Sequence, residues 1–216
     1  MKCSRKTYFV AAAALALLFA ALLTGVRTLD VRPIGPMGST VGLAAVNERV
    51  FAGTGVHLFW YTLTDWLGVA AVLTALGFAV LGLVQLIRRR SFFKVDGSLY
   101  ALAVVYLLTV GCYILFELWI VNYRPVLMQG RLEASFPSSH TMIVCTIMAT
   151  AMMEFRTRLK NKTVRAAVQA LCAGLMLVTV AGRLISGVHW FTDILGGLLL
   201  SGALTMLYAG RRPRTL

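Results

Sequence analysis

Two histidines in the sequence stand beside residues that could give them a chemical role. His189 and Asp193 are four residues apart, so both would lie on one face of a helix. A carboxylate at that separation can accept a hydrogen bond from one imidazole nitrogen and leave the other nitrogen free as a nucleophile. His140 ends the stretch FPSSH, residues 136–140, directly before an apolar helical pattern, where it could donate a proton to a bound anion. The two histidines therefore suggest a nucleophile and an acid.

The neighbouring residues suggest that the bound anion is a phosphate. Pro137, Ser138 and Ser139 begin a helix whose first N–H groups are unpaired and whose dipole is positive, an arrangement that binds phosphate. Arg124 and Arg183 add two guanidinium groups that suit phosphate oxygens. This set favours phosphoryl transfer, in which positioning and charge stabilisation supply most of the catalysis. The sequence has no carboxylate cluster suited to magnesium, so neither a metal ion nor another cofactor is expected.

Each residue also has a purely structural interpretation. Ser138 and Ser139 could simply cap the helix, with His140 at the membrane interface and without a role. Arg183 could be an interface anchor, and Asp193 a charge at a helix N-terminus that contributes about 0.3–1 kcal/mol. These interpretations are reasonable one at a time. They weaken together if the fold brings the residues to one place, which depends on the elements that carry them.

The composition is that of a membrane protein. The 216 residues are 59% hydrophobic and only 13% charged, whereas about a quarter of a soluble domain is charged. The net charge of +13 comes from short basic clusters at the ends of apolar segments, a pattern of membrane orientation signals that argues against a nucleic-acid partner. The four cysteines are scattered, which predicts neither disulfides nor a metal site, and they are interpreted as small buried apolar side chains: Cys3, Cys112, Cys145 and Cys172.

Six apolar segments are long enough to cross a membrane or nearly so. The first is too long for the apolar region of a signal peptide and is interpreted as a retained span. No internal repeat or soluble domain is apparent, so we expect one domain over residues 1–216, an all-α bundle of six transmembrane helices. The expected spans are residues 8–26, 63–87, 99–120, 138–155, 166–181 and 190–208.

The connection between the first two spans has its own character. Residues 28–61 are rich in glycine and proline, and residues 41–51 have apolar side chains at helical spacing with polar ones between them. Followed by three aromatic residues, this segment predicts a helix lying in the membrane interface, which either roofs an active site or only anchors the chain. His57 is interpreted as an interfacial residue, and Asp65 as a cap of the second span.

The basic residues orient the bundle. With six spans, both termini lie on one side, and 15 of the 21 Lys and Arg residues fall on that side against 6 on the other. Basic connections stay in the cytoplasm, so the termini are expected inside. The connections that carry Arg124 and His140, and Arg183 and His189, then both face outward. This topology predicts that the candidate residues share one end of the bundle.

At this point the sequence resembles a family, the type 2 phosphatidic acid phosphatase superfamily of membrane lipid phosphatases. The family's motifs are Lys, six residues, Arg-Pro; then Pro-Ser-Gly-His; then Ser-Arg, five residues, His, three residues, Asp. The corresponding stretches here are Arg124-Pro125, residues 137–140, and Arg183, five residues, His189, three residues, Asp193. The motif-bearing half covers about residues 117–193, and the three matches occur in the family's order.

The resemblance implies a role for each motif residue. His189 would attack phosphorus to form a phosphohistidine, Asp193 would orient it, and His140 would protonate the leaving group. Water would then release phosphate. The phosphate oxygens would be held by Arg124, Ser138, the backbone near Ser139, and Arg183.

The chain departs from the motifs at three positions. Ser139 replaces glycine, a mild change if its N–H still points inward, and Gly182 replaces serine, which removes one possible hydrogen bond. Glu117 stands where the family has its first-motif lysine, and a carboxylate there would repel a doubly charged phosphate monoester. Glu117 could be protonated or point away. Glu117 could also indicate a substrate whose phosphate carries less local charge, such as a phosphodiester or pyrophosphate, or it could bind or activate a headgroup.

The leading hypothesis is an outward-facing lipid phosphatase that is independent of metal ions and acts on phosphatidic acid, phosphatidylglycerophosphate or a polyprenyl pyrophosphate such as undecaprenyl pyrophosphate. The alternative, which Glu117 makes less remote, is a headgroup phosphotransferase or phospholipase C-like enzyme related to sphingomyelin synthases. A third possibility is an inactive lipid-binding or transport protein, against which the intact histidines argue. Six spans exclude a soluble vanadium haloperoxidase. The short chain suggests a bacterial cytoplasmic membrane, while the sequence leaves the oligomeric state open.

Overall fold

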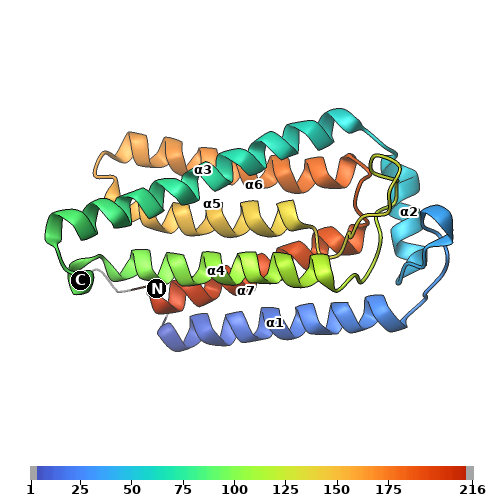
Figure 1. Cartoon of the computed structure of the whole chain (residues 1–216), viewed down its shortest axis with the longest axis horizontal. Coiled ribbons are helices and arrows are strands. Elements are labelled where there is room, and N and C mark those ends of the chain that lie inside the picture. The colour runs from blue at the N-terminus through green and yellow to red at the C-terminus, as the bar shows by residue number, and fades with distance from the viewer. Residues whose placement is uncertain (1–3, 213–216) are drawn as a thin grey trace.

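The computed structural model describes residues 4–212, and these residues form seven α-helices (Figure 1). Two short 3₁₀ turns, Pro36–Gly38 and Phe92–Lys94, complete the regular structure, and no extended β-strand occurs in this range. The helices are α1 Arg5–Thr28, α2 Ala44–Thr54, α3 Leu58–Arg89, α4 Gly97–Leu118, α5 Ser139–Arg158, α6 Lys162–Ile185 and α7 Phe191–Arg211. The all-α prediction is therefore confirmed.

Each long helix coincides with one predicted span and extends beyond it at one end or at both, although α4 stops at Leu118, two residues before its predicted end. The largest difference is at α6, which was predicted over 166–181 and runs from Lys162 to Ile185. Asn161 caps its start by accepting hydrogen bonds from the N–H groups of Thr163 and Val164. Hydropathy marks only the part of a helix that lies in hydrocarbon, whereas charged ends continue into the headgroup region. The predicted bounds are therefore short for this physical reason.

Five of the long helices are apolar enough to cross a membrane: α1, α3, α4, α6 and α7. The helix α5 has the length of a span, but half of its residues are buried, including Thr141, Thr146 and Thr150. It packs against α3, α4, α6 and α7 (Figure 1). Because α5 is surrounded by protein rather than lipid, its sequence can be less apolar than that of its neighbours. Its central position also holds its first residues in the middle of one end of the bundle.

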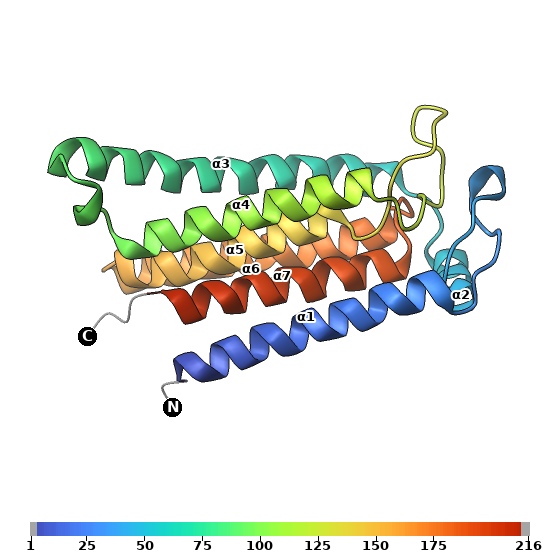
Figure 2. The same ribbon diagram turned by 60° about the horizontal axis from the view of Figure 1, so that its bottom comes forward.

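The outer helix α1 packs along α7 (Figures 1 and 2). Toward its C-terminal end, Phe19 meets Phe116 edge-on at 5.7 Å between ring centroids and stacks on Phe136 at 5.8 Å. Phe136 is almost fully buried and directly precedes Pro137. This aromatic cluster therefore fixes the end of the loop that leads into α5.

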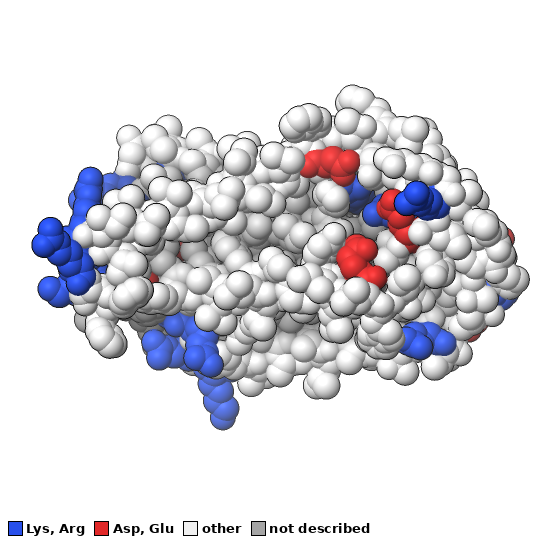
Figure 3. Space-filling model, in the orientation of Figure 1, with Lys and Arg blue, Asp and Glu red and all other residues white. Residues whose placement is uncertain are grey.

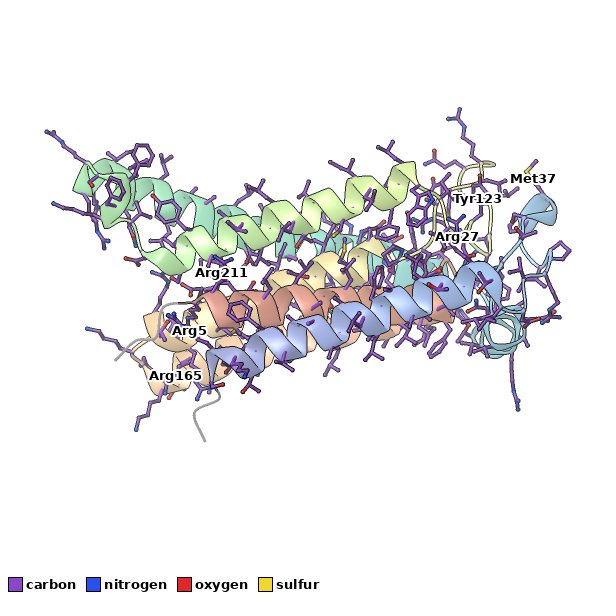
Figure 4. The ribbon with its side chains drawn as sticks, turned by 90° about the horizontal axis from the view of Figure 1, so that it is seen from below. Arg5, Arg27, Met37, Tyr123, Arg165 and Arg211 are labelled. Atoms are coloured by element: carbon purple, nitrogen blue, oxygen red, sulfur yellow. The ribbon has the colours of Figure 1, made fainter. Side chains whose placement is uncertain are left out.

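The two ends of the bundle differ in charge. Arg5, Arg165 and Arg211 lie at one end, whereas Arg27 and Tyr123 lie at the other (Figure 4). In the face shown by Figure 3, Lys and Arg gather at the left end, and the largest Asp and Glu patches lie in the right-hand half beside further basic atoms. The basic end is the end at which α1 begins and α7 finishes. Lys2, Cys3 and Arg214, which entered the sequence interpretation, lie outside the described residues.

The basic end is joined internally by a buried carboxylate. Glu154 on α5 is 1% exposed, accepts a short hydrogen bond from Tyr208 Oη on α7, and pairs with Arg158 at 2.7 Å and Arg212 at 3.4 Å. Ser98 at the start of α4 donates to it at 3.1 Å. This network ties α4, α5 and α7 together at the end opposite to the candidate residues.

At the other end, α2 is attached to the first turn of α7. The Asn47 side chain is fully buried; its Nδ2 donates to Thr192 Oγ1 at 3.0 Å and its Oδ1 accepts from the Thr192 N–H at 3.1 Å. Phe51 packs on Trp190 at 5.6 Å between ring centroids. The amide of Asn47 thus satisfies a free N–H at the start of α7. The helix predicted at 41–51 lies at 44–54, and its central polar residue faces the protein.

Candidate active site

Two stretches distant in sequence meet at the non-basic end: the loop before α5 with the start of α5, and the end of α6 with the turn into α7. The N–H of Ser138 donates to the Asp193 carbonyl at 2.9 Å, which joins the starts of α5 and α7. A small cavity is lined by Glu117, Ser135, Ser139 and His189 together with neighbouring apolar side chains. The predicted convergence of the candidate residues is thus present in the fold.

His189 lies in the turn between α6 and α7 and is almost completely buried. Gly187 in this turn has φ +68°, and a Cβ atom there would lie 2.0 Å from the Gly55 carbonyl oxygen, so only glycine fits. The His57 N–H donates to the Ser186 carbonyl at 3.1 Å, which ties the same turn to the segment before α3. His57 itself is exposed and positions the turn through its backbone alone.

The two nitrogens of His189 face different partners. Nε2 lies 3.4 Å from Nη1 of Arg124, and Nδ1 lies 3.3 Å from Oγ of Ser135. Burial lowers the pKa of His189 well below its ordinary value, and the nearby charges of Arg124 and Arg183 lower it further. The imidazole is therefore neutral at pH 7, as a nitrogen nucleophile requires.

Asp193 contacts His189 less directly than its spacing predicted. Its Oδ2 is 3.6 Å from His189 Nδ1, beyond hydrogen-bond distance, and accepts instead a short bond from Ser135 Oγ and one of 2.7 Å from the Trp190 N–H. Ser135 therefore lies between the carboxylate and the imidazole. Sequence reasoning missed Ser135, although it directly precedes the stretch FPSSH, because a serine in a loop carries no signal of its own.

The two arginines differ in how they are held. Arg183 is 0% exposed, and its Nε and Nη1 atoms are buried without a hydrogen-bond partner. Its Nη2 donates a short bond to Asp65, and its guanidinium lies 4.9 Å from the Tyr61 ring centroid. Arg124, on the loop before α5, pairs through Nε with Glu133 at 3.2 Å. Buried donors without partners are rare in proteins, so Arg183 is arranged for an additional acceptor.

His140 lies in the first turn of α5 and faces α3. Its Nε2 is 3.1 Å from Asp65 Oδ1, while its Nδ1 is buried without a partner. Asp65 was expected to cap the second span, and that prediction is wrong: α3 begins earlier, at Leu58, so Asp65 is in its third turn. Sequence analysis therefore missed Asp65 as a site residue, because its distance in sequence from every motif concealed its proximity to them.

The two serines before His140 do not act as side-chain caps. Ser138 is the residue that precedes α5, but its hydroxyl makes no bond to a helix N–H; it is fully buried and accepts from Thr141 Oγ1 at 3.1 Å. Ser139 is the first residue of α5 and lines the cavity with His189. No side chain caps the N–H groups of this helix start, as an anion site requires.

The other two departures from the motifs have distinct surroundings. Glu117 is exposed, lies one residue before the end of α4 and lines the cavity. Gly182 packs against α3: a Cβ atom there would lie 2.6 Å from Thr64 Cγ2 and 3.1 Å from Trp60 Cε3. A serine at position 182 would fit only if the Thr64 side chain or α3 itself moved.

Comparison with known proteins agrees with this geometry. The family model of the PAP2 superfamily matches residues 99–214, more than half of the chain. The chain belongs to the PAP2 superfamily. The resemblance to this superfamily is thereby confirmed.

The fold has a counterpart among solved structures. The crystal structure of a transmembrane PAP2 type phosphatidylglycerolphosphate phosphatase from Bacillus subtilis superposes with a TM-score of 0.66 at 17% sequence identity, over 93% of this chain and 94% of that chain. This likeness identifies a transmembrane PAP2 fold and therefore an integral membrane protein. No curated protein matches the sequence.

Proposed function

We propose that this protein is an outward-facing lipid phosphatase that releases phosphate from a lipid phosphate monoester or pyrophosphate. The observation that carries the proposal is Arg183, a fully buried guanidinium with two unpartnered donors, which shares Asp65 with His140 and whose charge acts on His189. A buried charge with unsatisfied donors destabilises the folded protein unless an anion accepts hydrogen bonds from those donors. A phosphate at this point would also reach Arg124 and the uncapped start of α5.

In the proposed first step, the His189 Nε2 lone pair attacks phosphorus. The phosphorus–nitrogen bond forms while the bond to the lipid oxygen breaks, and His140 transfers a proton to that oxygen. Asp193 and Ser135 hold the opposite nitrogen, Nδ1, so that the ring keeps its orientation. In the second step water attacks phosphorus, its proton passes to His140, and the phosphorus–nitrogen bond breaks to release inorganic phosphate. No step requires a metal ion.

The membrane arrangement supports a lipid rather than a soluble substrate. We propose that α5 is a sixth span and that α2 lies in the outer interface, so that residues 1–216 form one domain with both termini in the cytoplasm. The basic end, which contains α1's start and α7's end, supports this orientation. A lipid with its tail in the bilayer then presents its phosphate at the level of Arg183. A bacterial cytoplasmic membrane is the proposed location.

The substrates to test follow from the site and from the similar fold. The structurally similar protein from Bacillus subtilis is a phosphatidylglycerolphosphate phosphatase, so phosphatidylglycerophosphate is the first candidate, beside phosphatidic acid and polyprenyl pyrophosphate. Glu117 favours a second candidate function, headgroup transfer or phospholipase C-like cleavage. Its carboxylate lines the same cavity as His189, where it would repel a dianionic phosphate monoester and tolerate a phosphodiester.

The experiment is a panel of these lipids with both products identified for the purified protein in detergent. Release of inorganic phosphate supports hydrolysis, whereas diacylglycerol with a transferred or released headgroup phosphate supports the second function. His189→Ala should abolish turnover, and His57→Ala, a change at an exposed histidine outside the site, should not. Turnover by the His189→Ala protein would refute the nucleophile assignment, and inactivity of the wild type on every lipid would refute both functions.

A further inference from the structure

The helix α3 carries no family motif, yet it forms one wall of the site. Asp65 contacts His140 and Arg183 through the same oxygen, Oδ1. Gly68, one turn later, lies against the His140 ring: a Cβ atom there would be 3.0 Å from Cδ2. The His140 imidazole thus lies between the Asp65 carboxylate and the backbone of α3 at Gly68, which has no side chain.

We propose, on the basis of the proposed phosphatase function, that Asp65 is a positioning residue of the reaction, which orients His140 as the acid and holds Arg183 for the phosphate. Asp65 accepts from Nε2 of His140, so the proton delivered to the leaving oxygen comes from Nδ1, the nitrogen that has no partner. The site then contains two histidine–carboxylate pairs. Asp193 serves the nucleophile and Asp65 serves the acid.

The contact with Arg183 has a separate consequence. Asp65 uses only Nη2 and leaves Nε and Nη1 without partners. A buried guanidinium without any counter-charge is strongly unfavourable. Asp65 therefore stabilises Arg183 in the empty site and fixes its plane, while two donors remain for phosphate oxygens.

The packing of α3 explains why this chain places a carboxylate here. Asp65 can reach Arg183 only because α3 lies very close to α6, and Gly182 makes that approach possible through its contacts with Thr64 and Trp60. Position 182 is where the family motif has serine. In this chain, the glycine at position 182 and the Asp65 contact with Arg183 therefore depend on the same close packing of α3 against α6.

The ionic surroundings of His140 make the effect of Asp65 measurable. Arg183 and Arg124 disfavour an imidazolium at this position, and Asp65 favours it. The charged or titratable groups that act on His140 from the surrounding elements are Asp65 of α3, Arg183 of α6, Arg124 of the loop before α5, and His189 of the turn into α7. Since His140 must be protonated to act as the acid, loss of Asp65 should move the alkaline limb of kcat to lower pH.

The test compares Asp65→Asn with Asp30→Asn, a change at a carboxylate that binds the Ala45 N–H and Arg32 away from the site. We expect Asp65→Asn to lower kcat on the lipid substrate by about 100-fold, the scale of general acid catalysis, and to shift the alkaline limb downward. On p-nitrophenyl phosphate, an aryl phosphate whose phenolate leaves readily without a proton, the loss should be about 10-fold or smaller. Asp30→Asn should match the wild type.

An Asp65→Asn protein with wild-type kcat, an unmoved alkaline limb, or equal losses on the lipid and aryl substrates would overturn the proposal. Because each outcome is measured against an active wild type, inactivity of the wild type refutes the phosphatase function instead. Thermal unfolding of each variant in detergent separates misfolding from catalytic loss.

A second pair of variants tests the packing argument. Gly182→Ser, which restores the family's residue, should lower activity because its Cβ meets Thr64 Cγ2. The double variant Gly182→Ser with Thr64→Ala removes that atom and should recover most of the loss. A gain of activity in the single variant, or no recovery in the double one, contradicts the link between Gly182 and Asp65.

Discussion

Replacement of Ser135 by alanine tests how the nucleophile is oriented. The Ser135 hydroxyl joins the Asp193 carboxylate to His189 Nδ1, and the direct gap between carboxylate and imidazole is 3.6 Å. In the Ser135→Ala protein, Asp193 keeps its hydrogen bond to the Trp190 N–H but is no longer connected to the His189 ring by a hydrogen bond. The imidazole then loses the partner that holds Nε2 toward phosphorus.

The magnitude follows from the kind of bond that is lost. A hydrogen bond to a charged group contributes about 1.5–3 kcal/mol, and 1.36 kcal/mol corresponds to a tenfold change in rate. We therefore expect kcat to fall by about 10- to 150-fold, with a smaller change in KM, because the Ser135 hydroxyl is engaged by His189 and Asp193. Ser135→Thr keeps the hydroxyl and should retain more activity than Ser135→Ala.

The assay is steady-state phosphate release at saturating lipid in mixed micelles, with Ser201→Ala as the matched control. Ser201 is equally buried, and its hydroxyl donates only to the Leu198 carbonyl within α7. A Ser135→Ala protein within about twofold of the wild type would refute the reasoning. It would mean that Asp193 approaches His189 directly during turnover.

Three further predictions concern specificity, pH and stability. Glu117→Lys should shift preference toward dianionic phosphate monoesters, since a cation replaces a carboxylate in the cavity; identical rates across the lipid panel would make Glu117 a bystander. Burial lowers the pKa of His189, so the neutral nucleophile should persist below about pH 6.5, the ordinary pKa of histidine. In a profile of kcat/KM against pH from about 4 to 8, the midpoint of the acidic limb should therefore lie below about pH 6.5. A midpoint above that pH would contradict a neutral buried His189. Glu154→Ala leaves Arg158 and Arg212 without their buried partner and should lower the free energy of unfolding by about 3–5 kcal/mol. This loss should be measured as a lower unfolding temperature in detergent. An unchanged unfolding temperature would show that the network is dispensable.

The sequence was sufficient for the features that rest on hydropathy and spacing. The long apolar segments predicted the helices, and the basic clusters predicted that Arg124, His140, Arg183 and His189 share one end of the bundle. Both follow from local rules, since a bilayer demands continuous apolar helices and the charges between them set direction. The helix bounds were short because charged residues at helix ends carry no hydropathy signal.

The features that were missed depend on how helices pack. Asp65 was interpreted as a cap because its contact with His140 and Arg183 joins residues of α3, α5 and α6, a juxtaposition that no spacing in the chain reveals. Gly182 looked like a lost hydrogen bond, whereas in the structure it packs directly against Thr64 and Trp60 of α3. Asn47 looked like a polar residue of an interfacial helix and is in fact a buried cap of α7. In each case the partner is distant in sequence.

The central claim is that His189 carries the phosphoryl group during turnover. Rapid acid-free quenching of the enzyme with a lipid labelled in its phosphate, followed by peptide mapping, measures this directly. If His189 is the nucleophile, a base-stable, acid-labile label should appear on the peptide that contains His189, and none in the His189→Ala protein. A label on His140 or another residue, or inorganic phosphate released in a burst without labelled protein, would contradict it.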